Sequence, residues 1–384
     1  MVMDLDTPAV DYVLSTTRSV RLRLDFDREV DPQIVLDCID IAEQAPTGGN
    51  RGSRRWIVIS DSAQKEKLAD LYLRSAGKWM ISSRDKLAGT NHPNEKMIES
   101  AAYLAENLAK APLIVIPVII GLHDNSGRPG LFDSVLQSAW SFCLALRARG
   151  LGSAWTTAIL SEQEELKETL GIPSGVTEIA MFPVAWTKGT KFSKVSRSPS
   201  REITFFNDYG LTFGSGPSSP ISLSDAPGVS VEIDIDCPLV KVWEVATDIN
   251  FPAKFSDEFI SAKWNDKKGM GLGATFVGKN GNKHLGEWTV ECTIDRYEEN
   301  RVFGWCTGDI SSPAARWRFE LESFGSSTRL RHIALLGPGP SGLTRIIDNQ
   351  PDKESQIILN RAKSIRANMI QVLEGMKVHL ENQS

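Results

Sequence analysis

Two arginines and a serine stand close together near the start of the chain, in the segment Thr16 to Arg21 (TTRSVR). Guanidinium groups donate paired hydrogen bonds in a fixed geometry that matches phosphate oxygens. Arg18, Ser19 and Arg21 can therefore converge on one phosphate group. An exposed basic helix end is the alternative interpretation of the same residues.

A glycine-rich loop at residues 45–56 (APTGGNRGSRRW) follows a segment with helical spacing. Pro46 ends that helix, and Gly48 has no side chain, so the backbone there can approach a flat ligand closely. Thr47 and Asn50 add short polar groups. An ordinary glycine-rich connection would explain the glycines but not these polar groups.

Two later segments carry further polar groups. Residues 150–157 (GLGSAWTT) predict a strand that ends at Thr156 and Thr157, whose hydroxyl and amide groups can donate to an electron-rich ring. A β-branched strand end that needs no ligand is the alternative. Residues 191–201 (KFSKVSRSPSR) add basic side chains that include Arg197, and a solvated basic tail is the alternative there.

Helices and buried strands must position these segments. Apolar residues at helical intervals predict helices at residues 31–45 and 131–149. The second helix is hydrophobic nearly all round, which is typical of a core or a subunit interface. Runs of β-branched residues predict buried strands at residues 55–60 and 112–120.

Composition divides the chain into two domains. The 384 residues exceed what one hydrophobic core usually organises, and residues 210–228 are rich in Gly, Ser and Pro without an apolar period, which is typical of a linker. We therefore predict a first domain at residues 1–209 and a second at residues 229–384. In the second domain strands dominate, with a hairpin turn expected at Asn280-Gly281, until a long helix closes the chain.

Charge and composition exclude several classes of protein. The formal net charge is −5 at pH 7, so no overall positive field attracts nucleic acid. The longest apolar run is too short to cross a membrane, and the N-terminal segment lacks the pattern of a secretory signal. Five scattered cysteines without a C-x-x-C pair predict reduced thiols and a cytoplasmic location, and the dispersed histidines favour no metal site.

The order and spacing of the polar segments resemble the FMN-dependent nitroreductases over about residues 8 to 208. The resemblance rests on TRSVR, APTGGN, GLGSAWTT, EELKETLGIP and RSP, in that order along the chain. It implies an α+β fold in which the first domain is a three-layer α/β/α sandwich. It also implies an obligate homodimer with the cofactor at the subunit interface, against which the apolar helix at residues 131–149 would pack.

The resemblance implies FMN as the cofactor, bound by the residues that match the family's motifs. These residues are Arg18, Ser19, Arg21, Pro46, Thr47, Gly48, Asn50, Thr156, Thr157 and Arg197. In the family, the position of Arg197 reaches the FMN phosphate, and the positions of Thr156 and Thr157 face the reactive flavin nitrogen.

The implied reaction is hydride transfer through the flavin in ping-pong turnover, so no catalytic side chain is assigned beyond the cofactor. NAD(P)H is the expected reductant, with reduced deazaflavin left open, and the acceptor is a nitroaromatic, quinone-like or other conjugated small molecule. One departure from the family is Gly52, Ser53 and Arg54, where many members have Gln-Pro-Trp. It creates a positive cluster with Arg51 and Arg55 that faces either the pocket or solvent.

Residues 229–380 resemble the SRPBCC superfamily, which includes START-like and polyketide-cyclase-like folds. The resemblance rests on Cys237-Pro238, VWEVATDINFPAKF, RWRFEL and the closing helix, and it implies a helix-grip fold that encloses an apolar ligand. The residues expected to line the ligand cavity are Trp264, Phe276, Trp288, Trp305, Trp317 and Met369. A plain hydrophobic core is the alternative for these aromatic residues. His332 is expected either as a polar group of the cavity or as a surface residue.

Two functions remain open at this level. The first is a flavoenzyme whose second domain holds an apolar small molecule, and it predicts a yellow protein. The second is a ligand-binding or carrier protein with a vestigial flavin domain. It predicts a colourless protein that binds apolar ligands without consuming a reductant.

Overall fold

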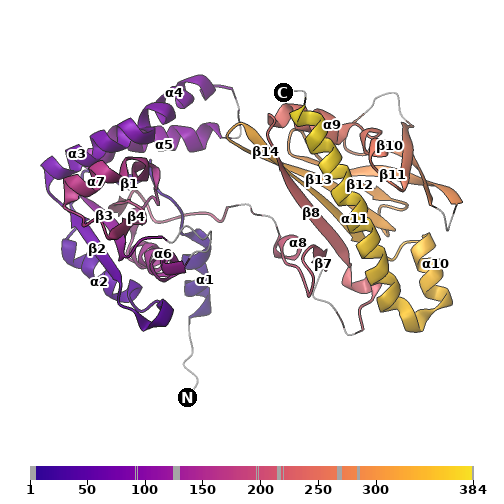
Figure 1. Ribbon diagram of the computed structural model, residues 1–384, viewed down its shortest axis with the longest axis horizontal. Helices are drawn as coiled ribbons and strands as arrows, with labels where there is room; N and C mark the ends of the chain where they lie inside the picture. Colours follow the sequence, from indigo (N-terminus) through magenta and orange to yellow (C-terminus); the bar gives the residue numbers. More distant parts are fainter. Residues whose placement is uncertain are drawn as a thin grey trace, which may run out of the picture. The chain divides into compact units, whose positions relative to one another are not determined.

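The computed structural model describes residues 6–90, 92, 94–123, 130–195, 197, 199–213, 218, 220–265, 270–282 and 286–382. The chain divides into two compact units, residues 1–196 and residues 197–384 (Figure 1). Among the described residues, no helix combines the length and the apolar character needed to cross a membrane.

The first unit is built on a six-stranded sheet whose strands pair antiparallel. Its main path runs β1-β6-β3-β2, with β4 paired to β6 and β5 paired to β3. The strands are β1 (Leu24–Asp25), β2 (Arg54–Ile59), β3 (Leu113–Ile120), β4 (Leu151–Ser153), β5 (Val176–Glu178) and β6 (Phe182–Thr187).

Helices cover both faces of this sheet. They are α1 (Thr7–Thr16), α2 (Pro32–Ala42), α3 (Ser62–Tyr72), α4 (Lys78–Leu87), α5 (Glu95–Asn107), α6 (Asp133–Ala148) and α7 (Gln163–Leu170). Strand β3 is apolar along its whole length because both of its faces are buried. Leu113 and Val115 pack with α2 and α6, whereas Ile114 and Ile116 pack with α3 and α5. The predicted three-layer α/β/α arrangement is confirmed.

The second unit is an eight-stranded antiparallel sheet in the order β7-β8-β14-β13-β12-β11-β10-β9 (Figure 1). The strands are β7 (Leu211–Thr212), β8 (Gly228–Ile235), β9 (Phe259–Trp264), β10 (Thr275–Asn282), β11 (Gly286–Glu298), β12 (Val302–Thr307), β13 (Ala315–Phe324) and β14 (Ser327–Leu336). The helices are α8 (Ser200–Ile203), α9 (Leu239–Thr247), α10 (Gly342–Asn349) and α11 (Glu354–Glu381).

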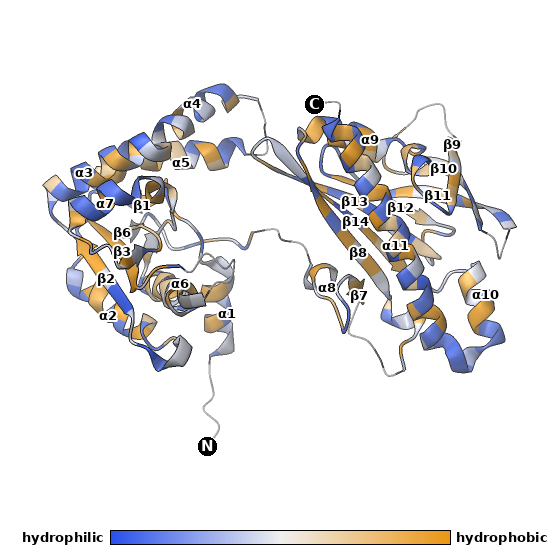
Figure 2. Ribbon diagram, viewed as in Figure 1, coloured by the Kyte–Doolittle hydropathy of each residue, from blue (hydrophilic) through white to orange (hydrophobic). Residues whose placement is uncertain are grey.

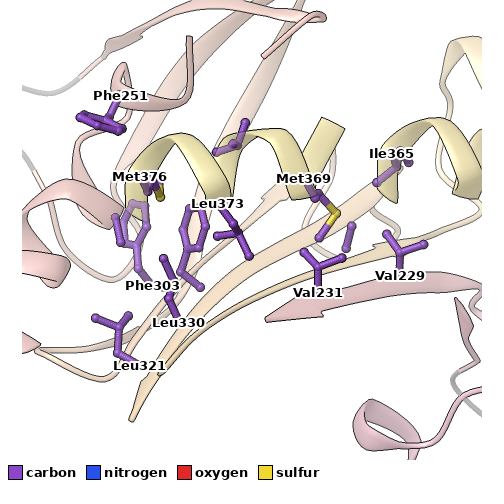
Figure 3. Packing of buried hydrophobic residues seen from close by; sticks show 14 of the residues in the cluster. Val229, Val231, Phe251, Phe303, Leu321, Leu330, Ile365, Met369, Leu373 and Met376 are labelled. Atoms are coloured by element: carbon purple, nitrogen blue, oxygen red, sulfur yellow. The ribbon is translucent and has the colours of Figure 1, made fainter. Parts of the chain in front are cut away.

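Helix α11 lies along one face of this sheet, and the apolar residues of both form the core of the unit. Figure 2 shows both hydrophobic and hydrophilic residues along α11, as an amphipathic helix requires. In Figure 3, Met369 and Ile365 of this helix project toward Val231 and Val229 of β8. The predicted helix-grip arrangement of the second unit is confirmed.

Two details of the second unit differ from the sequence-based expectations. Leu211, Phe213 and Leu223 fall in the segment with linker composition, yet they are buried in the second core, and β7 pairs with β8. The turn expected at Asn280-Gly281 is wrong, because Asn280 pairs with Trp288 inside the ladder of β10 and β11. The ladder continues to Asn282, and cross-strand packing therefore overrides the local preference of Asn-Gly for a turn.

Gly375 allows Phe255 to pack directly against α11. A Cβ atom at position 375 would lie 2.3 Å from the Phe255 ring carbon Cγ. Alanine normally stabilises a helix relative to glycine by up to about 1 kcal/mol, whereas forcing an extra methyl group into a packed core costs about 1–3 kcal/mol. We expect Gly375→Ala to lower the free energy of unfolding, measured by urea denaturation. Glu374→Ala at the exposed neighbouring position should stay within about 0.5 kcal/mol of the wild type, and a stabilised Gly375→Ala variant would contradict the close packing.

Candidate functional site

The segment after α1 lies against strand β4, although more than a hundred residues separate them in sequence. Helix α1 ends at Thr16, and Thr17 takes an extended conformation. The backbone N–H of Val20 then donates to the carbonyl oxygen of Ser153 at 2.8 Å. The predicted phosphate-binding segment and the GLGSAWTT segment are therefore brought together.

A small pocket of about 30 Å³ opens between this segment, α6 and β4. It contains Arg18 and Ser19 of the predicted FMN site. The residues that line it are Thr16, Thr17, Arg18, Ser19, Val20, Trp140, Cys143, Arg147, Leu151, Gly152, Ser153, Trp155 and Phe192. Burial raises the pKa of the Cys143 thiol to about 12, so this cysteine is protonated at neutral pH and is a poor nucleophile.

Two polar atoms that belong to pocket residues are buried without a hydrogen-bond partner. They are Ser153 Oγ and Arg147 Nε, on residues whose exposed fractions are 8% and 9%. The rest of the Arg147 guanidinium is held in place, since Nη2 donates to the carbonyl oxygen of Thr190 at 3.1 Å and the group lies 4.7 Å above the Phe192 ring. Native proteins rarely bury a polar atom without a partner, so these two atoms are the unpaired polar groups of the residues that line the pocket.

The two predicted phosphate-binding arginines point to different surroundings. Arg18 is exposed and donates to the carbonyl oxygen of Ser193. Arg21 is half-buried and donates to Ser100 Oγ of α5 at 3.3 Å. Burial lowers the pKa of the Arg21 guanidinium, and the nearby Tyr72 hydroxyl acts in the opposite direction.

The two predicted threonines differ in exposure. Thr156 forms a backbone bridge with Met181, and its hydroxyl lies 3.2 Å from the Tyr72 hydroxyl, so it is buried and satisfied. Thr157 is exposed. Because Arg21 also lies close to Tyr72, these residues bring the N-terminal segment and the end of the GLGSAWTT segment to one place.

The predicted loop at residues 45–51 is mostly exposed. Gly48–Asn50 form a short 3-10 turn in which Gly49 and Asn50 have positive φ angles of 62° and 54°. The Gly48 N–H donates to Ser134 Oγ of α6 at 2.8 Å. Pro46 is exposed and Thr47 is half-buried. The surface of the loop therefore consists of short side chains and backbone atoms.

Arg54 does not face a pocket, and the expected positive cluster therefore divides. Arg54 is only 6% exposed, and its guanidinium donates to the carbonyl oxygens of Glu43, Ala45 and Ser134. Its Nε atom also lies 3.2 Å from a Glu43 carboxylate oxygen. Arg51 and Arg55 are exposed. Arg54 is thus a structural residue that joins the loop to α2 and α6.

Arg197 is exposed and belongs to the second unit. Its neighbours Ser196 and Ser198 lie outside the described residues. Its role at the FMN phosphate therefore stays a prediction.

In the second unit most of the predicted ligand residues lie on the face of the sheet that α11 covers. The rings of Trp264 and Phe276 are 5.4 Å apart, those of Phe276 and Trp305 are 6.3 Å apart, and those of Trp305 and Trp317 are 6.4 Å apart. Met369 of α11 is buried in the same core. Trp288 is half-buried and pairs with Asn280 near the hairpin end of β11.

His332 is buried on this face rather than at the surface. In the sheet, His332 of β14 lies directly opposite Phe319 of β13 on one side and Val231 of β8 on the other. Both neighbours belong to the core. Both of its ring nitrogens lack a hydrogen-bond partner. Burial lowers the pKa of His332 to about 3, so its ring is neutral at physiological pH.

The other face of the same sheet is charged. A hollow of about 180 Å³ there is lined by Asp295, Arg296, Arg316, Arg318, Ile333 and Leu335, and Trp317, whose side chain alternates to the other face, also borders it. Arg316 forms an ion pair with Asp295. The Nε atom of Arg318 lies 2.8 Å from a carboxylate oxygen of Glu320. These charges compensate one another within the protein.

Comparison with known families agrees with the division of the chain. Residues 14–186 match the model of the nitroreductase family. Residues 226–344 match the family described as polyketide cyclase / dehydrase and lipid transport. The chain joins a nitroreductase domain to a polyketide-cyclase-like domain.

Individual relatives are distant. The 5,6-dimethylbenzimidazole synthase of Rhodospirillum rubrum is 23% identical over 166 residues, which are 41% of this chain and 74% of that protein. Among solved structures, iodotyrosine deiodinase bound to FMN and 3-iodo-L-tyrosine is 19% identical over 52% of this chain and 99% of its own, with a TM-score of 0.40. A polyketide-cyclase-like protein from Corynebacterium glutamicum is 24% identical over 43% of this chain and 94% of its own, with a TM-score of 0.34.

Sequence reasoning did not single out two residues of the nitroreductase domain, Arg147 and Ser153, and it left His332 undecided between the cavity and the surface. Arg147 of the nitroreductase domain is an arginine inside an otherwise apolar helix, which is a usable signal. Ser153 lies within the segment that was identified but was not chosen from it. His332 of the polyketide-cyclase-like domain occupies an inward position of an alternating strand, where a polar residue is unusual.

Arg54 gives a test of how the loop of the nitroreductase domain is held. Lysine keeps the positive charge but cannot reach three carbonyl oxygens at once, and each lost hydrogen bond costs about 0.5–1.5 kcal/mol. We expect Arg54→Lys to lower the free energy of unfolding by about 2 kcal/mol in urea denaturation. The neighbouring exposed Arg55 is the matched control. Arg55→Lys should change the free energy of unfolding by less than about 0.5 kcal/mol. Equal effects of the two variants would contradict the assigned role of Arg54.

Proposed function

We propose that the first unit binds FMN and that the chain is an FMN-dependent oxidoreductase. NAD(P)H is the proposed reductant, and a nitroaromatic, quinone-like or other conjugated molecule is the proposed acceptor. The observation that carries the proposal is the pocket beside Arg18 and Ser19, where Ser153 Oγ and Arg147 Nε are buried without partners. Two such atoms belonging to one pocket support a polar ligand at this position.

The side chains around the pocket fit a phosphorylated, planar cofactor. Arg18 and Ser19 offer guanidinium and hydroxyl donors at an exposed position, where a phosphate can stay partly hydrated. Trp140 and Trp155 offer flat apolar surface at the same pocket. The family resemblance adds Arg197 as a further phosphate-binding residue.

The protein's own groups would bind and orient the ring. FMN supplies the hydride transfer when bound, and the protein supplies position and electrostatics. Tyr72 and the bridge to Met181 fix Thr156, and this holds the exposed Thr157 beside it. The half-buried positive charge of Arg21 lies near the same hydroxyl pair and would favour negative charge on a bound ring.

We further propose that the functional unit is a homodimer. A pocket of about 30 Å³ is far too small to enclose a flavin, and we infer that one chain supplies only part of the site. Helices α1, α2 and α6 also expose large apolar side chains that a second copy would cover. These are Val10, Tyr12 and Leu14 on α1, Leu36 and Ile41 on α2, and Leu136 and Trp140 on α6.

We propose that the second unit binds an apolar small molecule between its sheet and α11. This proposal is supported by the aromatic rings that pack against the core of the second unit, among which Trp264, Trp305 and Trp317 are only partly buried. Large aromatic rings offer flat apolar surface to a small molecule.

Removal of the Arg18 guanidinium tests the FMN site. Arg18 is exposed, so Arg18→Gln should fold normally, and loss of a charge-assisted hydrogen bond should raise the Kd for FMN at least about tenfold. The Kd is measured by quenching of free FMN fluorescence. Arg28→Gln is the control, because Arg28 lies over the Trp186 ring and not at the pocket. Equal Kd values for the two variants would reject the site, and a wild-type protein with no affinity for FMN would favour the carrier function.

A charge on α6 tests the dimer. Leu136 is 40% exposed, and Leu136→Glu should dissociate the dimer in sedimentation velocity experiments and weaken FMN binding, because a buried unpaired carboxylate is costly. Leu272→Glu is the control, since Leu272 is 71% exposed in the second unit. A Leu136→Glu variant that remains dimeric would place the interface elsewhere. A monomeric wild type that binds FMN would contradict the proposed dimer.

A further inference from the structure

His332 is a polar residue in the least polar part of the second unit. It is 7% exposed, and neither ring nitrogen has a hydrogen-bond partner. A neutral imidazole carries one N–H donor and one acceptor nitrogen, and both need partners when buried. Phenylalanine would fill the same space without this cost, so the chain retains a group that lowers its own stability.

The surroundings of His332 are aromatic. Its ring stacks on Phe319 with centroids 4.2 Å apart, and the Trp317 ring lies 5.8 Å away. Trp305 and Trp317 lie nearly parallel on neighbouring strands, with 9° between their planes, and both are partly exposed. These rings form a flat aromatic platform beside the imidazole.

The helix above this face supplies apolar and adaptable side chains. Figure 3 shows Met369 and Leu373 of α11 pointing toward the strands that carry Val231 and Leu330. Methionine has a flexible, polarizable side chain that can repack around a ligand. The inner face of the sheet and α11 can therefore adjust to a planar molecule between them.

The charges of this sheet point away from His332. Because side chains alternate along a strand, Arg316 and Arg318 lie on the opposite face from Trp317, and Arg331 lies on the opposite face from His332. A carboxylate or phosphate at His332 would be buried without a cationic partner, which is costly. The surroundings thus favour an uncharged polar group.

We propose that the second unit binds a planar aromatic molecule that carries a hydroxyl group, with its ring against Trp305 and Trp317 and its hydroxyl hydrogen-bonded to His332. A hydroxyl donates and accepts, so it can partner one ring nitrogen of the imidazole in either tautomer. This inference rests on the proposed ligand-binding function of the second unit, and it names the class of ligand and the residue that recognises it.

The test compares two compounds that differ only in the hydroxyl group. Equilibrium dialysis of the full chain at neutral pH measures the Kd of 1-naphthol and of naphthalene. The wild type is expected to bind 1-naphthol at least tenfold more tightly. In His332→Phe this preference should disappear while naphthalene binding persists, and the thermal midpoint of unfolding should stay equal or rise.

Thr328 provides a matched control on the same strand. It is a buried polar residue like His332, but its hydroxyl donates to the carbonyl oxygen of Cys237 at 2.9 Å. Thr328→Val should therefore lose thermal stability and keep the preference for 1-naphthol. A group that is merely structural would behave in the opposite way, with His332→Phe destabilised and the preference unchanged.

The outcomes separate the two proposals. If neither compound binds the wild type, the ligand-binding function of the second unit fails and this inference fails with it. If both bind with equal Kd, ligand binding stands but hydroxyl recognition by His332 is overturned. If His332→Phe retains the preference, the recognition site is elsewhere and the inference is overturned.

Discussion

The candidate FMN site depends on one backbone contact, the hydrogen bond from Val20 N–H to Ser153 O that holds the segment after α1 against β4. Val20 is buried, so the neighbouring Arg18 and Ser19 are carried to the edge of the pocket. Both walls of the pocket come from distant parts of the chain, and neither wall alone places a donor near Ser153. The position of the donors is therefore a property of the sheet rather than of the motif.

Buried polar groups in this protein fall into two kinds. Arg54 donates to three carbonyl oxygens, and its Nε atom, which makes no hydrogen bond, is paired with the Glu43 carboxylate at 3.2 Å, so Arg54 makes the loop of the first unit part of its core. Ser153, Arg147 and His332 each bury at least one polar atom that the chain does not satisfy. Because an unsatisfied buried atom costs free energy, the binding proposals made above for both units rest on residues of the second kind.

The two units use their sheets differently. Both faces of β3 in the first unit are covered by helices, so its sequence is apolar throughout. In the second unit one face is aromatic and covered by α11, and the other is charged, with pairs such as Arg331 and Glu232 at 2.9 Å. In the first unit the candidate polar residues therefore lie in loops and at strand ends. In the second unit His332 is a polar residue on the apolar face of the sheet.

The sequence alone determined the periodic features, because local spacing records which face is buried. These features are the buried strand at 112–120, the helices predicted at 31–45 and 131–149, the strands of the second unit and the long closing helix. It also identified the order of the polar motifs. Only the tertiary structure decided that β7 joins the second sheet, that Asn280 continues a strand, that Arg54 is buried and that His332 lacks partners. Each of these depends on contacts between residues distant in sequence, whose pairing no local pattern specifies.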